Sequence, residues 1–518
     1  MIELLETAAE AHGDRMAWSF FEDEDNWSFR QVRDGAHRAA NALLELGVRH
    51  GDRVAVMVPN GSLYLQTWLG LAIIGAAIVP VNARYTPREV LHVVETSAAG
   101  LLILDPQHDA IATAVTERHE RGDLACVTVF SEGMRNSFRD QVTRQTTGCR
   151  PGWTARPDDL LNVQFTSGTT GLPKGCMLTH RYWTIAAVSW DGYLDVPVDR
   201  VLVNQMLFYV DGQFLAMFAL RRGATLFCAR RPSASSWLGW VREHRINAGF
   251  YFDPMFKTSE TDVDADNELA VLTTFGFQPA RHSALETRFR TRVRESYGMT
   301  ELAPALVMPL NADVTVGSAS CGLPAPFCEA KVVDANGVEV APGVTGQLVL
   351  RSPAQMTGYY DDPNASAEAI RDGWLHTGDL FRRDEDGFFY MVGRMKDMVR
   401  RNSENVACAE VESVLRLSDL VAEAAVVGVP DDRVGEEIKA YLQLRPDVEP
   451  ASVDLDELLA FCRRHLAVFK VPRYFTFVDQ LPMTESARVS KSALLSASGV
   501  TGAKTYDSVT GCWAAGVT

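Results

Sequence analysis

Helical and extended patterns of apolar residues alternate along the first part of the chain. From Trp27 to Val58 a helical pattern is followed by a Gly-Asp turn and a short apolar strand, and the same order recurs in Leu63–Val81 and Pro87–Leu104. Such alternation is typical of a parallel sheet covered by helices. The pattern therefore predicts an α/β fold.

The pattern then changes twice. Residues 130–157 are polar and rich in turn residues, which predicts a loop or an irregular crossing. Further strands are expected between helices at Leu160–Phe165, Ala224–Cys228, Ala248–Phe252 and Val271–Phe275. From Gly322 to Leu350 short strands and turns predict a small antiparallel β unit.

The last part of the chain predicts a separate α+β domain. Helical patterns at Glu410–Arg416 and Leu455–His465 are interleaved with strand patterns at Glu423–Val429, Ile438–Leu444 and Tyr474–Val478. We place the boundary near Lys396, which gives a domain over 1–395, a second over 396–498 and a tail over 499–518. The residues of the tail are small and polar, so we expect it to be loosely held.

Composition narrows the class of protein. A chain of 518 residues is too long for one core, and a net charge of −16 argues against a nucleic-acid partner. The longest apolar run, Trp68–Val81, is too short to span a bilayer, and the acidic N-terminus does not have the pattern of a signal peptide. Nine scattered cysteines without metal-ligand spacing indicate reduced thiols. We therefore expect a cytoplasmic protein with no membrane partner.

A glycine- and hydroxyl-rich segment, QFTSGTTGLPKGCMLTH over Gln164–His180, directly follows a predicted strand. Open α/β sheets bind ligands at such strand ends, and backbone N–H groups with hydroxyls and one lysine can cradle a polyphosphate. The candidate phosphate-binding residues are Thr166, Ser167, Gly168, Thr169, Thr170, Gly171 and Lys174.

This segment is not the common nucleotide P-loop. That motif has Gly before its Lys and Ser or Thr after it, whereas Pro173 precedes and Gly175 follows Lys174. A flexible Ser/Thr/Gly linker is the alternative. The ordered Pro-Lys-Gly ending between two apolar runs favours a binding loop.

Two further segments carry groups suited to a nucleotide. In Tyr297–Glu301 the aromatic ring could stack on a base, Gly298 would permit close approach, Thr300 could contact a phosphate and Glu301 could hold Mg²⁺. A buried tyrosine and a helix-capping Thr-Glu pair would explain this segment equally well.

Asp379, in the segment WLHTGD, could accept hydrogen bonds from a ribose diol. Arg394 could reach the same ribose, and Lys396 could act as a hinge. The alternatives are a turn aspartate and a solvated charge cluster.

The order TSGTTGLPKG, YGMTE, TGD and GRMKD closely resembles the adenylate-forming superfamily, in the branch of acyl-CoA synthetases and AMP-dependent ligases. The resemblance covers roughly residues 20–495. It implies a large N-terminal domain of two helix-covered sheets plus a small β-barrel, and a small mobile α+β C-terminal domain. It also implies two half-reactions, in which an acid is joined to AMP with release of pyrophosphate and the activated group then passes to a nucleophile.

The resemblance assigns roles by position. The loop residues and Lys174 would hold the β- and γ-phosphates of ATP, Tyr297 with Gly298 would lie near adenine, and Thr300 would contact the α-phosphate. Glu301 would bind Mg²⁺, Asp379 and Arg394 would hold the ribose, and Lys396 would be the hinge.

Four positions depart from the superfamily pattern. Arg488 stands where a catalytic lysine is usual; it keeps the charge but is bulkier. Ser403 replaces a glycine beside the expected pantetheine passage. Tyr209 and Asp211 lie where a histidine and a small or neutral residue are common beside the acyl pocket. The pocket strand reads Gly276, Phe277, Gln278, and Phe277 narrows the space for the acid.

Three of these departures fall at positions expected to contact the acid or the acceptor thiol, whereas the residues expected to bind ATP match the superfamily pattern. Our first hypothesis is a CoA ligase for a small or aromatic acid, using ATP and Mg²⁺. The alternative is an ATP-dependent diazotase that activates nitrite for attack by an aromatic amine, with Asp211 binding or deprotonating the amine. A nucleotide-binding homologue without catalysis is a third possibility, and the chain is expected to be a monomer or homodimer.

Overall fold

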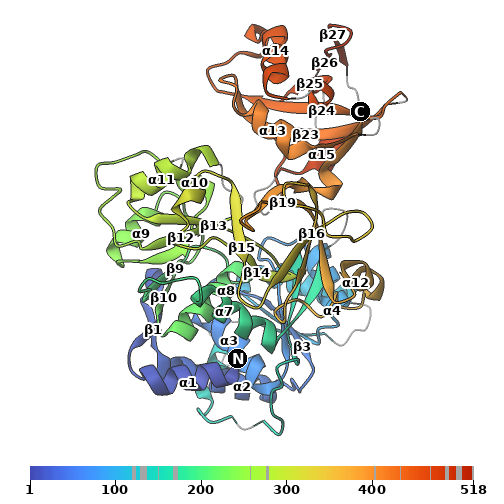
Figure 1. Ribbon diagram of the computed structural model, residues 1–518. Coiled ribbons are helices and arrows are strands. Elements are labelled where there is room, and N and C mark those ends of the chain that lie inside the picture. Colours follow the sequence, from blue (N-terminus) through green and yellow to red (C-terminus); the bar gives the residue numbers. More distant parts are fainter. Residues whose placement is uncertain are drawn as a thin grey trace. The chain divides into compact units, whose positions relative to one another are not determined.

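The computed structural model describes residues 1–119, 124–128, 137–149, 151–166, 173–256, 258–275, 279–401, 404–431, 433–466, 468–484, 489–496 and 504–515. These residues form two compact units (Figure 1). Unit 1 comprises Met1–Lys331, Val349–His376 and Asp386–Phe389, and unit 2 comprises Val332–Leu348, Thr377–Glu385 and Tyr390–Thr518.

The first sheet of unit 1 has the strand order β6-β5-β3-β4-β7-β8. All neighbours are parallel except β7 and β8, which are antiparallel. Its strands are β3 (Arg53–Met57), β4 (Ala77–Pro80), β5 (Leu101–Leu104), β6 (Ala125–Thr128), β7 (Leu160–Thr166) and β8 (Lys174–Thr179). The predicted phosphate-binding segment thus connects the only antiparallel pair among the described strands of this sheet.

The second sheet of unit 1 contains the order β15-β14-β13-β12-β11-β9-β10-β1-β2. The strands from β13 to β1 are parallel, and β14, β15 and β2 join antiparallel. The bounds are β1 (Met16–Phe20), β2 (Asp25–Ser28), β9 (Arg200–Val203), β10 (Thr225–Cys228), β11 (Ala248–Phe250), β12 (Val271–Thr274), β13 (Arg292–Met299), β14 (Leu302–Val307) and β15 (Ser320–Pro324).

The helices of unit 1 are α1 (Ile2–His12), α2 (Phe29–Glu45), α3 (Ser62–Ile74), α4 (Pro87–Ser97), α5 (Asp109–Arg118), α6 (Phe138–Arg144), α7 (His180–Asp191), α8 (Val210–Arg222), α9 (Trp237–Glu243), α10 (Asp253–Phe256), α11 (His282–Phe289) and α12 (Pro363–Ala369). Capping boxes define where two of them begin: Ser28 with Gln31 starts α2, and Thr86 with Glu89 starts α4.

Helix α3 is apolar around its whole circumference, and each of its residues is buried. A helix of this kind belongs in the interior of a large domain. It packs closely on α2, since a Cβ at Gly70 would lie 2.8 Å from the backbone nitrogen of Ala40. Its polar group Trp68 Nε1 donates to Asn162 Oδ1 on β7 at 2.9 Å, so the burial leaves this donor satisfied.

Several strands have residues in both units. They are β16 (Glu329–Val333), β17 (Gly346–Arg351), β19 (Trp374–Arg383) and β20 (Phe389–Arg394), with the short β18 (Ile370–Arg371) paired to β19. The Asn336–Gly337 turn predicted from the sequence is present, with Asp334 N donating to Val338 O at 2.9 Å and Gly337 at φ +80°.

Unit 2 is built around the hairpin β23–β24, and its sheet order is β22-β21-β24-β25-β26-β27 with β23 paired to β24. Its helices α13 (Cys408–Leu415) and α14 (Leu455–His465) contribute to one core, and α15 (Lys491–Leu495) lies on another. The strands are β21 (Met398–Arg401), β22 (Glu404–Ala407), β23 (Val421–Asp431), β24 (Gly435–Leu444), β25 (Tyr474–Phe477), β26 (Lys504–Asp507) and β27 (Cys512–Ala515).

The predicted α/β class is confirmed, and two local expectations are corrected. The polar stretch 130–157 contains helix α6, which is capped by the Ser137 hydroxyl accepting from Asp140 N. The region expected to be a loose tail supplies β26 and β27, and Arg473 holds Asp507 through two hydrogen bonds of 3.0 Å. Among the described helices, none has the length and apolar character that a membrane crossing requires.

Candidate active site

The two ends of the predicted phosphate-binding loop lie side by side. Thr166, the last residue of β7, pairs with Lys174, the first residue of β8, and the Lys174 side chain is exposed. Gly175 permits this close pairing, because a Cβ there would lie 2.7 Å from Val163 Cγ1. The other predicted loop residues, Ser167 to Gly171, lie outside the described residues.

The segment Tyr297–Glu301 forms the end of β13 and the turn into β14. Tyr297 and Gly298 belong to β13, and Thr300 and Glu301 occupy the turn. The Thr300 carbonyl accepts from the Tyr182 hydroxyl at 3.1 Å, and the Glu301 carbonyl accepts from Met356 N at 2.7 Å. Both sides of the turn are therefore fixed by the surrounding structure.

Tyr359 joins the loop to this turn, and sequence reasoning did not identify it. Its hydroxyl donates to Glu301 Oε1 at 2.7 Å, and the Lys174 ammonium lies 5.1 Å from the centre of its ring. The predicted phosphate-binding lysine and the predicted metal-binding carboxylate thus contact the same side chain. The available signal was the Gly-Tyr-Tyr sequence at 358–360, which follows an apolar strand.

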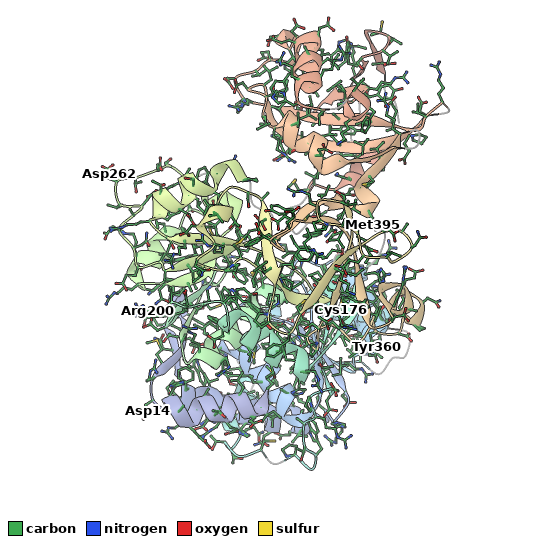
Figure 2. The ribbon with its side chains drawn as sticks, viewed as in Figure 1. Asp14, Cys176, Arg200, Asp262, Tyr360 and Met395 are labelled. Atoms are coloured by element: carbon green, nitrogen blue, oxygen red, sulfur yellow. The ribbon has the colours of Figure 1, made fainter. Side chains whose placement is uncertain are left out.

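We call residues 355–360 the connecting segment. At one end it contacts the Glu301 turn through Met356 N, and at the other Tyr360 N donates to Gly175 O at 2.7 Å. Cys176 and Tyr359 form a β-bridge, and Figure 2 shows Cys176 and Tyr360 close together. Gly358 has φ +145°, a conformation that favours glycine.

The environment of Glu301 is buried and holds several proton-bearing groups. Burial raises the pKa of the Tyr359 hydroxyl, and the negative charge of Glu301 raises it further. Burial also raises the pKa of the Cys176 thiol well above its usual value, with Glu301 again contributing. Both groups are therefore protonated near neutral pH, so Tyr359 donates to the carboxylate.

The predicted acid-side residues lie at the start of α8. Tyr209 is the residue before the helix, its hydroxyl accepts from Asn82 Nδ2 at 3.2 Å, and Asp211 is half-buried in the first turn. Burial raises the pKa of Tyr182, and the negative charges of Glu301 and Asp211 raise it further. Helix α7, whose Tyr182 hydroxyl donates to Thr300 O, packs on both α8 and β14, so the acid-side helix and the Glu301 turn share one neighbouring helix.

Aromatic rings gather beside the same helix. Phe214 lies one turn beyond Asp211 and stacks on Phe250 at the end of β11, with ring centroids 6.1 Å apart. Phe275, directly after β12, meets Phe250 edge to face at 5.1 Å. Trp190 on α7 contacts Phe214 at 5.4 Å. The pocket residues Gly276, Phe277 and Gln278 follow Phe275 and lie outside the described residues.

Unit 2 brings together the two residues predicted to hold a ribose. Asp379 lies on β19 with a side chain that is 5% exposed, and Arg394 Nε lies 3.1 Å from its Oδ1. Gly378 precedes the aspartate at φ +72°, and Asp379 N donates to the Thr377 hydroxyl at 3.1 Å. The guanidinium fixes the carboxylate, and the Thr377 hydroxyl fixes the backbone of the same residue.

The remaining predicted residues are only partly placed. Lys396 lies in the 3-10 helix Met395–Asp397, and its side chain is outside the described structure. Ser403 and Arg488 also fall outside it. Nearby, Lys491 forms an ion pair with Glu412 at 2.8 Å; burial lowers its pKa, but the neighbouring negative charges give a net rise. Lys491 therefore has a carboxylate partner within unit 2.

The residues fit a magnesium ion that arrives with a nucleotide. No group of three or more His, Cys, Asp or Glu side chains able to hold a metal occurs within the described ranges. Mg²⁺ needs no such group in enzymes of this kind, because one or two carboxylates plus substrate phosphates complete its shell. Glu301 can supply that carboxylate.

Family models decide the identity of the chain. The model described as "AMP-binding enzyme" matches residues 5–360, and the model for its C-terminal domain matches residues 410–488. The chain belongs to the AMP-binding enzyme family. Within the adenylate-forming superfamily it is an ATP-dependent, AMP-forming ligase, as the sequence motifs implied.

Sequence relatives with established names support this assignment, and the similarity covers most of each chain. A feruloyl-CoA synthase from Amycolatopsis sp is 34% identical over 462 residues, covering 88% of this chain and 90% of the relative. A fatty acid–[acyl-carrier-protein] ligase, ScoC, from Streptomyces coeruleorubidus is 31% identical, covering 90% and 91%.

Solved structures show the same fold. The anthranilate CoA ligase AuaEII in complex with anthranoyl-AMP matches with a TM-score of 0.85 and 25% identity, covering 96% of each chain. ATP-bound MatB from Rhodopseudomonas palustris matches with a TM-score of 0.87 at 24% identity, covering 95% and 98%. The AMP-binding enzyme therefore shares its architecture with enzymes seen holding ATP and an acyl adenylate.

Proposed function

We propose that this AMP-binding enzyme adenylates a small or aromatic carboxylic acid and transfers the acyl group to the thiol of CoA. The observation that carries the proposal lies within unit 1. Lys174 and Glu301 share one partner, Tyr359, and helix α7, whose Tyr182 hydroxyl donates to Thr300 O, packs on the helix α8 that carries Asp211. Groups suited to phosphates thus share a neighbouring helix with the residues suited to the acid.

An aromatic acid is favoured by the rings beside α8. Phe214, Phe250 and Phe275 lie at the carboxyl ends of parallel strands or on the adjoining helix, where open α/β sheets bind ligands. Aromatic side chains bury flat rings favourably in edge-to-face and offset arrangements. The names of two similar proteins, a feruloyl-CoA synthase and an anthranilate CoA ligase, support the same class of acid.

In the first half-reaction a carboxylate oxygen forms a bond to the α-phosphorus of ATP, and the bond from that phosphorus to pyrophosphate breaks. Lys174 and the loop backbone would bind the β- and γ-phosphates, and Thr300 would contact the α-phosphate. Mg²⁺ held by Glu301 would supply positive charge for the departing pyrophosphate. Such neutralisation of developing charge is the main source of catalysis in phosphoryl and nucleotidyl transfer.

Asp379 would hold the ribose hydroxyls. Its ion pair with Arg394 orients the carboxylate, and a carboxylate that accepts from a ribose diol is a recurrent feature of nucleotide sites. Arg394 would contribute a further donor to the same ribose.

A diazotase is the second candidate, and Asp211 is the observation that favours it. A half-buried carboxylate in the acid pocket repels a carboxylate substrate but can bind or deprotonate an aromatic amine. Nitrite would then be activated as its AMP anhydride, and the amine nitrogen would attack the nitrite nitrogen with AMP as the leaving group.

One assay separates the candidates. Pyrophosphate and AMP are measured with ATP, Mg²⁺ and CoA plus a panel of small and aromatic acids, then with nitrite plus aromatic amines. An acyl-CoA product identified by mass supports the ligase, whereas nitrite-dependent AMP formation supports the diazotase. Absence of pyrophosphate with every acid, nitrite included, would contradict both and favour a nucleotide-binding protein without catalysis.

A further inference from the structure

Tyr359 has two different contacts on one side chain. Its hydroxyl donates to Glu301 Oε1 at 2.7 Å, and its ring lies 5.1 Å from the Lys174 ammonium. We propose that Tyr359 is a positioning residue that fixes Glu301 through its hydroxyl and Lys174 through its ring. It would keep the metal-binding and phosphate-binding groups at one spacing. This inference rests on the proposed roles of Glu301 and Lys174.

The backbone around Tyr359 is fixed from both directions. Tyr359 N donates to the Ser366 hydroxyl at 2.8 Å, and its neighbour Tyr360 donates to Gly175 O on β8. Towards the other end of the connecting segment, Met356 N donates to the carbonyl of Glu301 itself. The ring therefore projects from a segment whose backbone is hydrogen-bonded to Glu301 and to Gly175, the residue after Lys174.

The hydroxyl contact should affect the metal. Hydrogen bonds to a ligating carboxylate orient it, and their removal typically weakens metal binding about 10- to 100-fold. Glu301 has a side chain suited to such orientation, because the residue is only 8% exposed and its turn is held by Tyr182 and Met356.

The ring contact should affect the phosphates. A cation over an aromatic face at an exposed site gains a modest attraction, which corresponds to about a threefold effect on binding. It also restricts the long Lys174 side chain, which is otherwise exposed. The two contacts can be separated, since Tyr359→Phe removes only the hydroxyl and Tyr359→Leu removes the ring as well.

The test measures binding without turnover. The full-length chain is mixed with α,β-methylene-ATP, which cannot release pyrophosphate, and Mn²⁺ binding is followed by electron paramagnetic resonance. Nucleotide binding in EDTA is followed by calorimetry. For Tyr359→Phe we expect Mn²⁺ affinity to fall about 10-fold, with metal-free nucleotide affinity unchanged. For Tyr359→Leu we expect metal-free nucleotide affinity to fall about 3-fold relative to the unaltered chain.

Tyr360→Phe is the matched control, because it removes one hydroxyl from the adjacent residue, whose ring lies near Arg53 instead. It should leave both affinities unchanged. A double-mutant cycle gives the sharpest readout: in a Glu301→Gln background, Tyr359→Phe should have no further effect on Mn²⁺. This coupling would not arise from a general loss of stability.

Two results would overturn the inference: Mn²⁺ affinity that is unchanged, or tighter, in Tyr359→Phe. Tighter binding would mean that Tyr359 competes with the metal for Glu301. Failure of the proposed function is distinguishable, because the unaltered chain would then bind neither the nucleotide analogue nor Mn²⁺ with it.

Discussion

The nucleotide side and the acid side of this enzyme differ in how closely they keep to the family pattern. On the nucleotide side Lys174, Glu301 and the Asp379–Arg394 pair stand at the expected positions and have defined partners. On the acid side Asp211 introduces a charge where the family usually has none. Activation by ATP is common to the family, and we propose that the departures on the acid side bear on the choice of acid and acceptor.

The largest effect is expected from Lys174→Ala. The substitution removes a charged donor, and hydrogen bonds to charged groups contribute about 1.5–3 kcal/mol, so kcat/KM for ATP should fall about 10- to 100-fold. Lys331→Ala is the matched control, because Lys331 also lies over an aromatic ring, that of Trp374, at 4.8 Å. Steady-state kinetics with varied ATP checks both. An unchanged KM and kcat in the Lys174 variant would contradict the phosphate-binding role.

Acidification should lower the free energy of unfolding through His180, which is the first residue of α7 and directly follows β8. Burial and, to a lesser extent, the positive charge of the N-terminal amine lower its pKa to about 4, against an opposing contribution from Asp159. The unfolded chain therefore binds the proton more tightly, so stability is fully present above pH 6.5 and falls as pH decreases towards 4. Between pH 7.5 and 5 this group should cost about 2 kcal/mol.

Urea unfolding of the unaltered chain and of His180→Leu at the two pH values measures this contribution. Neither ring nitrogen of His180 has a hydrogen-bond partner among the described residues, so the leucine variant should lose about 2 kcal/mol less on acidification. Equal losses in the two proteins would show that His180 does not titrate as its burial predicts.

A smaller effect is expected from Asp211→Asn, which removes the charge that distinguishes the acid side. If the enzyme is a carboxylate ligase, kcat/KM for aromatic acids should rise about fivefold, because like-charge repulsion is removed. If it is a diazotase, turnover with aromatic amines should fall instead. Tyr209→Phe provides a control that loses the contact with Asn82 but keeps the charge.

The smallest effect is expected from Arg488→Lys. Restoring the family residue keeps the positive charge, so acid-dependent pyrophosphate release should stay within about threefold of the unaltered enzyme or rise. Complete loss would show that Arg488 has a role of its own, such as gripping a non-carboxylate acid through two hydrogen bonds.

Sequence reasoning predicted those features that depend on local pattern. The helix–strand alternation located α2 and α4, where apolar periodicity and capping residues agree, and α3, whose continuous apolar run is too long for a strand. The motifs named Lys174, Glu301, Asp379 and Arg394. The ion pair of the last two, 15 residues apart, could be expected from their chemistry alone.

Features that depend on distant contacts were missed. Tyr359 lies 58 residues from Glu301 in sequence, and the contacts of the connecting segment with β8 and with the Glu301 turn bring them together. Helix α6 was missed because a short polar segment has weak periodicity, although Ser137 marks its start. The tail was expected to be loosely held because its residues are small and polar, and local pattern does not reveal the ion pair of Asp507 with Arg473, 34 residues away.

That tail has a practical bearing on how the protein is produced. Shortening the chain after Ser496 would remove β26 and β27, uncover the edge of β25 and leave Arg473 with Asp431 as its remaining carboxylate partner. An uncovered strand edge is a template for pairing between copies. A chain shortened in this way would therefore be prone to aggregate. An affinity tag is better joined at the N-terminus.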